Sequence, residues 1–289
     1  MFESVEAFYR PANVREALQL LQRGKGSARI VAGCTDVIVG GDRSVRFLID
    51  ITHAGLSYNR RRGANWAIGA TTTMAEIEDS AEIRGLAGGL LSRAAATCGP
   101  VQIRNMATVG GNMANGSPAA DLATPLLALD AAAVVADARG RRKMPLADYL
   151  AAARSRELAK SLLVEVTFAD PPRGSRCGWS FQKFGRTAVD ISVVNVAAGL
   201  QLDARGRVKW ARIALGAVAP APLRMAGAEA LMAGRTYDCV LVAAACESVM
   251  REVRPISDLR ASADYRRELS RVLTGRALEE CVAPSGCPL

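Results

Sequence analysis

The sequence predicts an α+β protein built in two parts, and three observations support this. Short strand-like and helix-like segments alternate over the first 172 residues, as they do in α/β units. Residues 169–175 contain paired prolines and small residues that can continue neither a helix nor a sheet, so they mark a boundary. Three longer strand-like runs and then three helical runs follow. We therefore expect domains over residues 1–172 and 173–289.

Composition and charge narrow the class of protein. Half of the 289 residues are hydrophobic, so the chain can bury a substantial core. The formal charge is +9, with basic clusters at 60–62 and 139–143 that we place in hydrophilic connectors. Aromatic residues are only 5% and are not interleaved with these clusters, which disfavours nucleic acid as a partner. No apolar run approaches about 20 residues and no signal peptide is recognisable, so we expect a cytoplasmic protein without a membrane span.

The cysteines are scattered, odd in number and never spaced C-x-x-C. This pattern argues against a disulfide framework and against an iron–sulfur or zinc site on this chain. The seven are Cys34, Cys98, Cys177, Cys239, Cys246, Cys281 and Cys287.

The first part contains mostly short elements. Asn13 should cap a helix, and one of the threonines at 71–73 should cap another. In order, we expect a helix from residue 14, strands at 28–31, 46–51 and 66–70, helices at 74–77 and 81–98, an extended piece at 101–105, a helix at 122–129, a strand at 132–136, a helix near 146–150 and a strand at 162–168.

The second part has longer elements. Strands at 178–184, 190–202 and 207–218 should form an antiparallel meander, because the turn at 203–206 joins the last two. Helices are expected at 225–233, 238–253 and 262–280. In the last helix, Tyr265, Leu269, Val272, Leu273 and Ala277 should face inward while the arginines point out.

Two glycine-containing turns are the candidate binding elements. In the turn at 107–121, Gly110 and Gly111 let the backbone bend tightly and bring bare N–H groups against a phosphate. Ser117 and Pro118 should then begin a helix. A second tight turn, at 32–36, leaves the strand at 28–31. An ordinary strand-to-helix turn is the alternative interpretation of the segment at 107–121.

These segments carry a resemblance to a known family. Residues 101–112, with Asn115, Ser117, Pro118 and Asp121, resemble the second FAD-binding motif of the medium, flavoprotein subunits of molybdenum hydroxylases, which include carbon monoxide dehydrogenase and xanthine dehydrogenase. Residues 32–36 are similar to the family's first FAD loop, usually Ala-Gly-Gly-Thr-Asp, with Cys34 at a glycine position. Lys183, Arg186 and Asp190-Ile191 match a third patch, and residues 254–267 resemble the C-terminal signature.

The resemblance implies a fold and a cofactor. The first domain would be a vanillyl-alcohol-oxidase (PCMH) type FAD-binding domain made of two α/β subdomains. The second would be a CO dehydrogenase flavoprotein type C-terminal domain, a three-stranded antiparallel sheet with a helical bundle. FAD would be bound noncovalently, its pyrophosphate between the two glycine-containing loops. The implied FAD-binding residues are Ala32, Gly33, Cys34, Thr35, Asp36, Thr108, Val109, Gly110, Gly111, Asn112, Asn115, Ser117, Asp121, Lys183 and Asp190.

Three of these residues have specific implied roles. Asp121 would accept a ribose hydroxyl, and Lys183 and Asp190 would lie on the flavin side. A solvated lysine and a strand-initiating aspartate remain alternatives for the last two. The resemblance implies no catalytic residue and no metal ligand here, and the single histidine, His53, is expected at the surface.

The implied function is electron transfer. The chain would take electrons from the [2Fe–2S] clusters of a small partner subunit and pass them to NAD, a quinone or O2. A large subunit would carry the molybdopterin cofactor, and two heterotrimers would form a heterohexamer. A self-sufficient FAD-dependent oxidase or reductase, and a non-redox nucleotide-binding module, are the alternatives. The substrate cannot be deduced from this chain, because the residues that select it lie on another polypeptide.

Cys34 departs from the family pattern and has three interpretations. The loop could take an ordinary conformation, a left-handed residue could be tolerated with strain, or the thiol could have a redox role. Beside a diphosphate a thiolate is disfavoured, which makes the redox role the weakest of the three.

Overall fold

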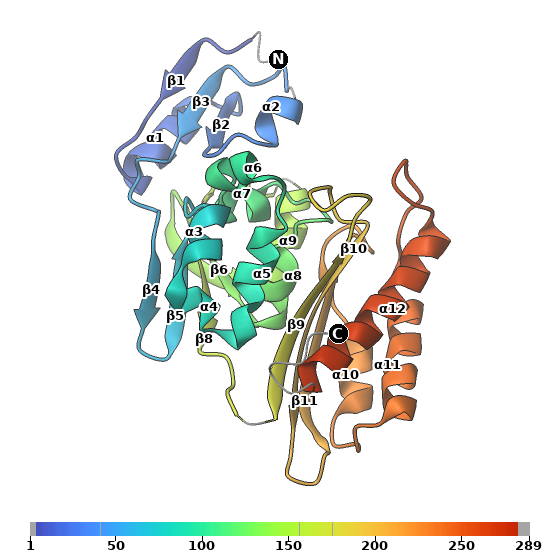
Figure 1. The fold of residues 1–289 in the computed structure, drawn as a ribbon. Helices are drawn as coiled ribbons and strands as arrows, with labels where there is room; N and C mark the ends of the chain where they lie inside the picture. The colour runs from blue at the N-terminus through green and yellow to red at the C-terminus, as the bar shows by residue number, and fades with distance from the viewer. Residues whose placement is uncertain (1–3, 41, 156, 175, 283–289) are drawn as a thin grey trace. The chain divides into compact units, whose positions relative to one another are not determined.

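The computed structural model describes residues 4–40, 42–155, 157–174 and 176–282 (Figure 1). The chain divides into two compact units, and each is interrupted in sequence. The first comprises Met1–Ile77, Pro100–Ser117 and Asp130–Asp170. The second comprises Glu78–Gly99, Pro118–Leu129 and Pro171–Leu289. Two segments from the N-terminal half of the chain are therefore part of the C-terminal unit.

The first unit begins with a small parallel sheet in the order β1-β3-β2. Its elements are β1 (Ala7–Tyr9), α1 (Val14–Arg23), β2 (Ala28–Val31), α2 (Val37–Gly40) and β3 (Phe47–Asp50). Parallel strands need a crossover connection. Helix α1 lies in the connection from β1 to β2, which flank β3, and α2 lies in the connection from β2 to its neighbour β3. The predicted cap is confirmed, because Asn13 Oδ1 accepts the Glu16 amide at 2.9 Å.

A five-stranded antiparallel sheet forms the rest of this unit, in the order β4-β5-β8-β6-β7. Its strands are β4 (Asn59–Arg62), β5 (Asn65–Gly69), β6 (Ala132–Asp137), β7 (Gly140–Pro145) and β8 (Leu162–Ala169). The helices α3 (Met74–Asp79) and α9 (Leu146–Arg154) follow β5 and β7. Thr73 caps α3, since its Oγ1 accepts the Glu76 amide at 3.1 Å.

The placement of the basic clusters in connectors is wrong. Both clusters form edge strands, β4 and β7, each paired through a tight hairpin. Exposed charged side chains suit an edge strand because they hinder its pairing with another sheet. Hydrophilic composition therefore did not separate these strands from loops.

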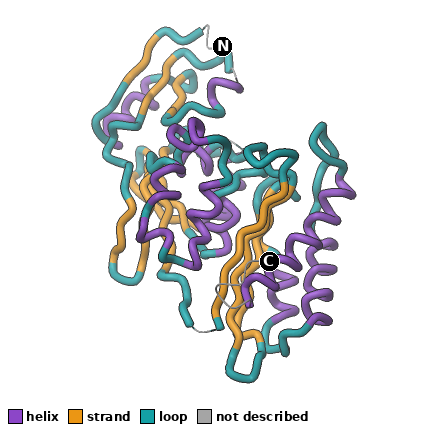
Figure 2. Tube along the Cα trace, viewed as in Figure 1, coloured by secondary structure: helices purple, strands orange, loops and turns teal. Residues whose placement is uncertain are grey.

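The second unit is a four-stranded antiparallel sheet in the order β12-β11-β10-β9, with helices packed along it (Figure 2). Its strands are β9 (Cys177–Phe184), β10 (Val194–Leu202), β11 (Val208–Gly216) and β12 (Leu223–Arg224). The predicted meander of three strands is confirmed, and β12 adds a short fourth strand to it. Helices α10 (Ala226–Met232), α11 (Cys239–Glu252) and α12 (Ala263–Val282) follow close to their expected positions.

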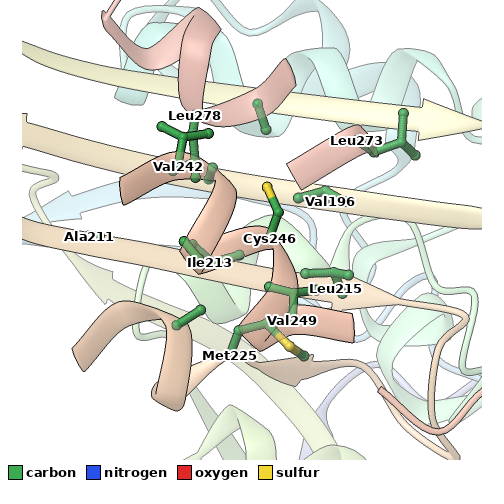
Figure 3. Close-up of a cluster of buried hydrophobic side chains, with 14 of the residues drawn as sticks. Val196, Ala211, Ile213, Leu215, Met225, Val242, Cys246, Val249, Leu273 and Leu278 are labelled. Carbon is green, nitrogen blue, oxygen red and sulfur yellow. The ribbon is translucent and has the colours of Figure 1, made fainter. Parts of the chain in front are cut away.

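Figure 3 shows the core of this unit between sheet and helices. Ile213 and Leu215 from β11 and Val249 from α11 belong to one buried cluster. Leu273 and Leu278 of α12 complete it on the helical side. Each of these side chains is at least 97% buried. This core includes residues of β10, which pairs with β9, and the two strands carry polar residues described below.

The inward stripe predicted for α12 is wrong at Tyr265, and the expectation that the arginines of this helix point out is wrong at Arg266; Val272 is half-buried. Tyr265 is 46% exposed, whereas its neighbour Arg266 is only 3% exposed. Arg266 Nη1 donates to the Val193 carbonyl at 2.6 Å, and its Nη2 donates to Asp258 at 2.7 Å. These two pairings offset much of the cost of burying the guanidinium, although its Nε has no acceptor among the described residues.

Residues 81–129 also differ from the expectation. The helix expected at 81–98 is divided into α4 (Ala81–Arg84), a 3₁₀ turn (Ala87–Gly89) and α5 (Leu90–Ala96), because Gly88 and Gly89 have φ angles of 58° and 76°. The extended piece expected at 101–105 is helix α6 (Val101–Met106). Ser117 and Pro118 begin no helix. Instead, α7 (Val109–Ala114) lies within the glycine turn and α8 (Ala123–Ala128) follows it.

Candidate functional site

The first predicted loop, Ala32–Asp36, connects β2 to α2 and exposes main-chain donors. Within the residues that the structure describes, the amides of Gly33, Cys34, Thr35 and Asp36 have no hydrogen-bond acceptor. The first three residues are half-buried and Asp36 is exposed. Successive unpaired amides in a turn form a concavity that binds phosphate oxygens. This loop has the donor set that a pyrophosphate requires.

Cys34 has a left-handed backbone, with φ of 58°. The interpretation in which the loop takes an ordinary conformation is therefore wrong, and the strained conformation is what the fold adopts. The Cys34 thiol donates to the Ala32 carbonyl, with Sγ 3.4 Å from the oxygen. Burial raises the pKa of the thiol, the Asp50 carboxylate raises it further, and Arg29 opposes the shift. These contacts favour the neutral thiol, which argues against a redox role.

Gly33 brings the two predicted loops into contact. A Cβ at this position would overlap the carbonyl group of Met106, which is the last residue of α6. Only glycine permits so close an approach between the two backbones. The fold of the first unit thus joins segments more than 70 residues apart in the sequence, as the FAD-loop interpretation requires.

The second predicted loop supplies fewer bare amides than we expected. Thr108 caps α7, and its Oγ1 accepts the Gly111 amide at 3.0 Å. The amides of Val109, Gly110 and Asn112 donate to main-chain carbonyls at 2.9, 2.7 and 2.9 Å. The expectation that these glycines present unpaired N–H groups is therefore wrong for this loop.

Gly110 is required for packing. A Cβ on Gly110 would lie 2.6 Å from the Ala70 carbonyl oxygen, whereas a Cβ on Gly111 would meet only Thr108 Oγ1, at 3.0 Å. Thr108, Val109 and Gly110 are buried, so they hold α7 against the five-stranded sheet.

The opposite face of α7 carries polar side chains. Gly111 and Asn115 are exposed and Asn112 is half-buried. Asn112 Oδ1 is a buried acceptor without a donor among the described residues. Ser117 is half-buried and follows Gly116, whose φ of 62° reverses the chain. A ligand with hydroxyl or amide donors would satisfy the Asn112 oxygen, so this face also fits a dinucleotide.

In the second unit, Asp121 is the centre of a buried polar network. Its Oδ2 accepts from Lys183 Nζ at 2.7 Å, and the same Nζ donates to the Thr97 carbonyl at 2.7 Å. Its Oδ1 accepts from Asn195 Nδ2 at 2.8 Å and from the Ser192 hydroxyl. The carboxylate and the ammonium side chains are 8% and 7% exposed. A buried ion pair of this kind persists only when hydrogen bonds satisfy its remaining atoms.

Ser192 and Asn195 were not predicted from the sequence. Asn195 is fully buried and its Oδ1 accepts from the Thr124 hydroxyl at 2.6 Å. Both residues lie in or beside an apolar strand run, where a single serine or asparagine has no distinctive spacing. Their only sequence signal is a polar side chain within a hydrophobic strand, since a buried polar group must be paired.

Asp190, in the connection between β9 and β10, has other partners than this network. Its carboxylate binds Arg186 Nε at 2.8 Å and accepts the Ile191 amide at 2.9 Å. Both hydrogen bonds, that from Arg186 first, lower the pKa of Asp190. The third predicted patch therefore separates into Lys183, whose side chain is buried, and an ion pair between the exposed Arg186 and the half-buried Asp190.

The C-terminal signature forms a loop closed by Asp258. Burial raises the pKa of this carboxyl group, but hydrogen bonds from the amides of Arg260 and Ala261 and from Arg266 together hold it at about 2. Arg266 ties the loop to β10 through the Val193 carbonyl. These residues have a structural role in positioning the loop.

Three further predictions concern His53, the cysteines and membrane-spanning helices within the described ranges. His53 is exposed. The six cysteines within these ranges are free, and Cys287 lies outside the described residues. No helix of these ranges combines the length and apolar character needed to cross a membrane.

Comparison with known proteins places the whole chain in one family. Residues 2–168 match the FAD binding domain in molybdopterin dehydrogenase, and residues 179–281 match the CO dehydrogenase flavoprotein C-terminal domain. The chain is 34% identical to the xanthine dehydrogenase FAD-binding subunit of Escherichia coli O157:H7, over 97% of both chains. It is 33% identical to the 6-hydroxypseudooxynicotine dehydrogenase complex subunit alpha of Paenarthrobacter nicotinovorans, over 93% of this chain and 92% of that one.

Solved structures agree with this assignment. A chain of carbon monoxide dehydrogenase from Hydrogenophaga pseudoflava superposes with a TM-score of 0.89 at 28% identity, over 97% of this chain and 98% of that one. A chain of reconstituted CO dehydrogenase from Oligotropha carboxidovorans gives 0.90 at 26% identity, over 99% and 100%. The chain therefore belongs to the FAD-binding subunits of the xanthine and carbon monoxide dehydrogenase family, which are components of molybdenum-dependent oxidoreductases.

Proposed function

We propose that the chain binds FAD noncovalently and transfers electrons within a molybdenum hydroxylase. The observation that carries the proposal is the loop at Gly33–Asp36, where unpaired amides follow one another in a left-handed turn. These amides are assigned to the FAD pyrophosphate. From the second loop, the exposed face of α7 and the unpaired Asn112 Oδ1 support contacts to polar groups of the same cofactor.

The remaining site assignments follow from the family resemblance. Ala32 and residues 108–111, with Asn115 and Ser117, are assigned to the FAD-binding loops. In the second unit, Asp121 is assigned to a ribose hydroxyl, and Lys183 and Asp190 to the flavin side. Oδ1 of Asp121 already accepts two hydrogen bonds, whereas Oδ2 accepts one, from Lys183, and can accept a second.

FAD supplies the chemistry, since an isoalloxazine exchanges electrons singly with iron–sulfur clusters and in pairs with other acceptors. The residues of this chain bind and orient the cofactor and set its electrostatic surroundings. We assign the [2Fe–2S] clusters to a small partner subunit and the molybdopterin cofactor to a large one, in a dimer of heterotrimers. NAD, a quinone or O2 is the electron acceptor.

Spectroscopy and copurification test this proposal. Purified protein should show a flavin spectrum, and acid precipitation should release the yellow chromophore into the supernatant. Flavin that remains in the pellet would contradict noncovalent binding, and a colourless folded protein would favour a non-redox nucleotide-binding module. Purification from the native source should recover the chain together with two partners, an iron–sulfur subunit and a molybdenum subunit. A lone chain that oxidises a substrate by itself would indicate the self-sufficient oxidase.

A further inference from the structure

The first unit contains a cavity lined by arginines. It has a volume of about 410 Å³ and lies beside the first turn of α1 and the five-stranded sheet. Arg15 of α1, Arg60 and Arg62 of β4 and Arg141 of β7 line it together with Tyr58. We call this cavity, defined by these five residues, the arginine groove. None of them belongs to the two FAD-binding loops.

Only one of the four guanidinium groups is neutralised. Arg62 Nη1 binds Glu165 Oε1 at 2.9 Å, and Glu165 Oε2 accepts from the Tyr58 hydroxyl at 2.6 Å. Glu165 therefore has no oxygen left unengaged. Arg60 lies over the Tyr58 ring, 4.4 Å from its centroid. Within the described residues, Arg15, Arg60 and Arg141 contact no carboxylate.

The neighbours of these arginines behave differently. Arg61 lies between Arg60 and Arg62 on β4. Its side chain therefore projects from the opposite face of the strand, and it pairs with Asp170. Arg142, next to Arg141 on β7, pairs with Asp137. The unpaired charges are thus concentrated on the side of the strands that lines the groove. Guanidinium groups held together without counter-charges repel one another and favour binding of an anion.

The spacing of the strands indicates the size of that anion. β4 and β7 are the two edges of the sheet, four interstrand spacings apart, which is about 19 Å between the two backbones. Arginine binds each phosphate through paired N–H groups, so a ligand with two or more phosphates pairs arginines from both edges more completely than a single phosphate does.

We propose that the arginine groove is a binding site for a diphosphate-bearing small molecule of the nucleoside diphosphate class. It is separate from the FAD-binding loops and goes beyond the proposed electron-transfer function. A diphosphate would replace the missing counter-charges of Arg15, Arg60 and Arg141.

Titration calorimetry on the FAD-loaded, full-length protein tests the proposal, with ADP and inorganic pyrophosphate as probes. The test variant is Arg60→Gln/Arg141→Gln, and the matched control is Arg61→Gln/Arg142→Gln, which removes the same charge from the same two strands. We expect affinity to fall about tenfold for each guanidinium removed from the groove. The control should change it less than threefold, and flavin content should stay constant in both.

The outcomes separate this proposal from the proposed function. If affinity for the phosphate probes fell equally in the test and control variants, binding would depend only on overall charge. That result would overturn the proposed site. Absence of binding at millimolar ADP and pyrophosphate would also overturn the proposal. Release of FAD by ADP would overturn it as well, because ADP would then occupy the FAD-binding loops. Binding of a polyglutamate peptide with the same arginine dependence, without binding of either phosphate probe, would instead identify an acidic protein segment as the ligand. Loss of flavin from the unmodified protein bears on the FAD proposal alone.

Discussion

Replacing Cys34 by glycine should stabilise the protein and keep FAD bound. Cys34 has φ of 58°, where a Cβ costs roughly 1–2 kcal/mol. Glycine removes that strain but loses about 0.5–1 kcal/mol through the greater freedom of the unfolded chain. The substitution also removes the hydrogen bond from the thiol to the Ala32 carbonyl, which is long at 3.4 Å. We expect a net gain of about 0.5–1 kcal/mol from the strain and entropy terms.

Denaturant unfolding of the flavin-loaded protein measures this gain, with Cys34→Ala as the matched control. Alanine keeps the Cβ and removes only the thiol, so Cys34→Ala should not be more stable than the unmodified protein. FAD affinity and the rate of flavin reoxidation should be preserved in both variants. A Cys34→Gly protein that is less stable, or that binds FAD but no longer transfers electrons, would refute the reasoning and implicate the thiol itself.

The pKa of the Cys34 thiol adds a pH dependence to the same comparison. Burial raises this pKa above its ordinary value of 9.0. A raised pKa stabilises the fold below the ordinary value, and that contribution is lost as the pH rises through the folded-state pKa. The unmodified protein should therefore lose stability above about pH 9 more steeply than Cys34→Gly.

Three further predictions concern other parts of the fold. Gly33→Ala should reduce both FAD content and stability, because its Cβ would overlap the Met106 carbonyl; the flavin-to-protein absorbance ratio and the unfolding midpoint measure these effects. Asn195→Ala should destabilise the second unit by about 2–4 kcal/mol in urea unfolding, because the buried Asp121 carboxylate loses a donor. Asp258→Asn should make the free energy of unfolding depend less on pH at acid pH. The lowered pKa of Asp258, about 2, stabilises the fold above about pH 4, and this contribution is lost as the pH falls toward 2.

Each of these predictions has an outcome that would contradict it. A Gly33→Ala protein with full flavin content would show that the two loops need not touch. Unchanged stability of Asn195→Ala would mean that water replaces the amide at Asp121. An acid limb identical in Asp258→Asn and the unmodified protein would assign acid unfolding to other carboxylates.

The sequence predicted most of the long elements correctly. The meander β9-β10-β11 and the helices α10 to α12 are confirmed because alternation and amphipathic periodicity extend over many residues. The short elements were harder to predict. The edge strands β4 and β7 consist largely of arginine and lysine, and the pairing that makes them strands comes from partners elsewhere in the chain.

The site divides in the same way between local and tertiary information. By itself the sequence determined where the two glycine-containing loops lie, their family, and the departure at Cys34, because these depend on residue types in a short stretch. Only the tertiary structure decided which amides are unpaired, since the partners of Val109 and Gly110 are carbonyls near residue 70, almost 40 positions away. It also decided that Asn195 completes the Asp121 network. Burial makes such pairing obligatory, but a linear sequence does not state which groups will be buried together.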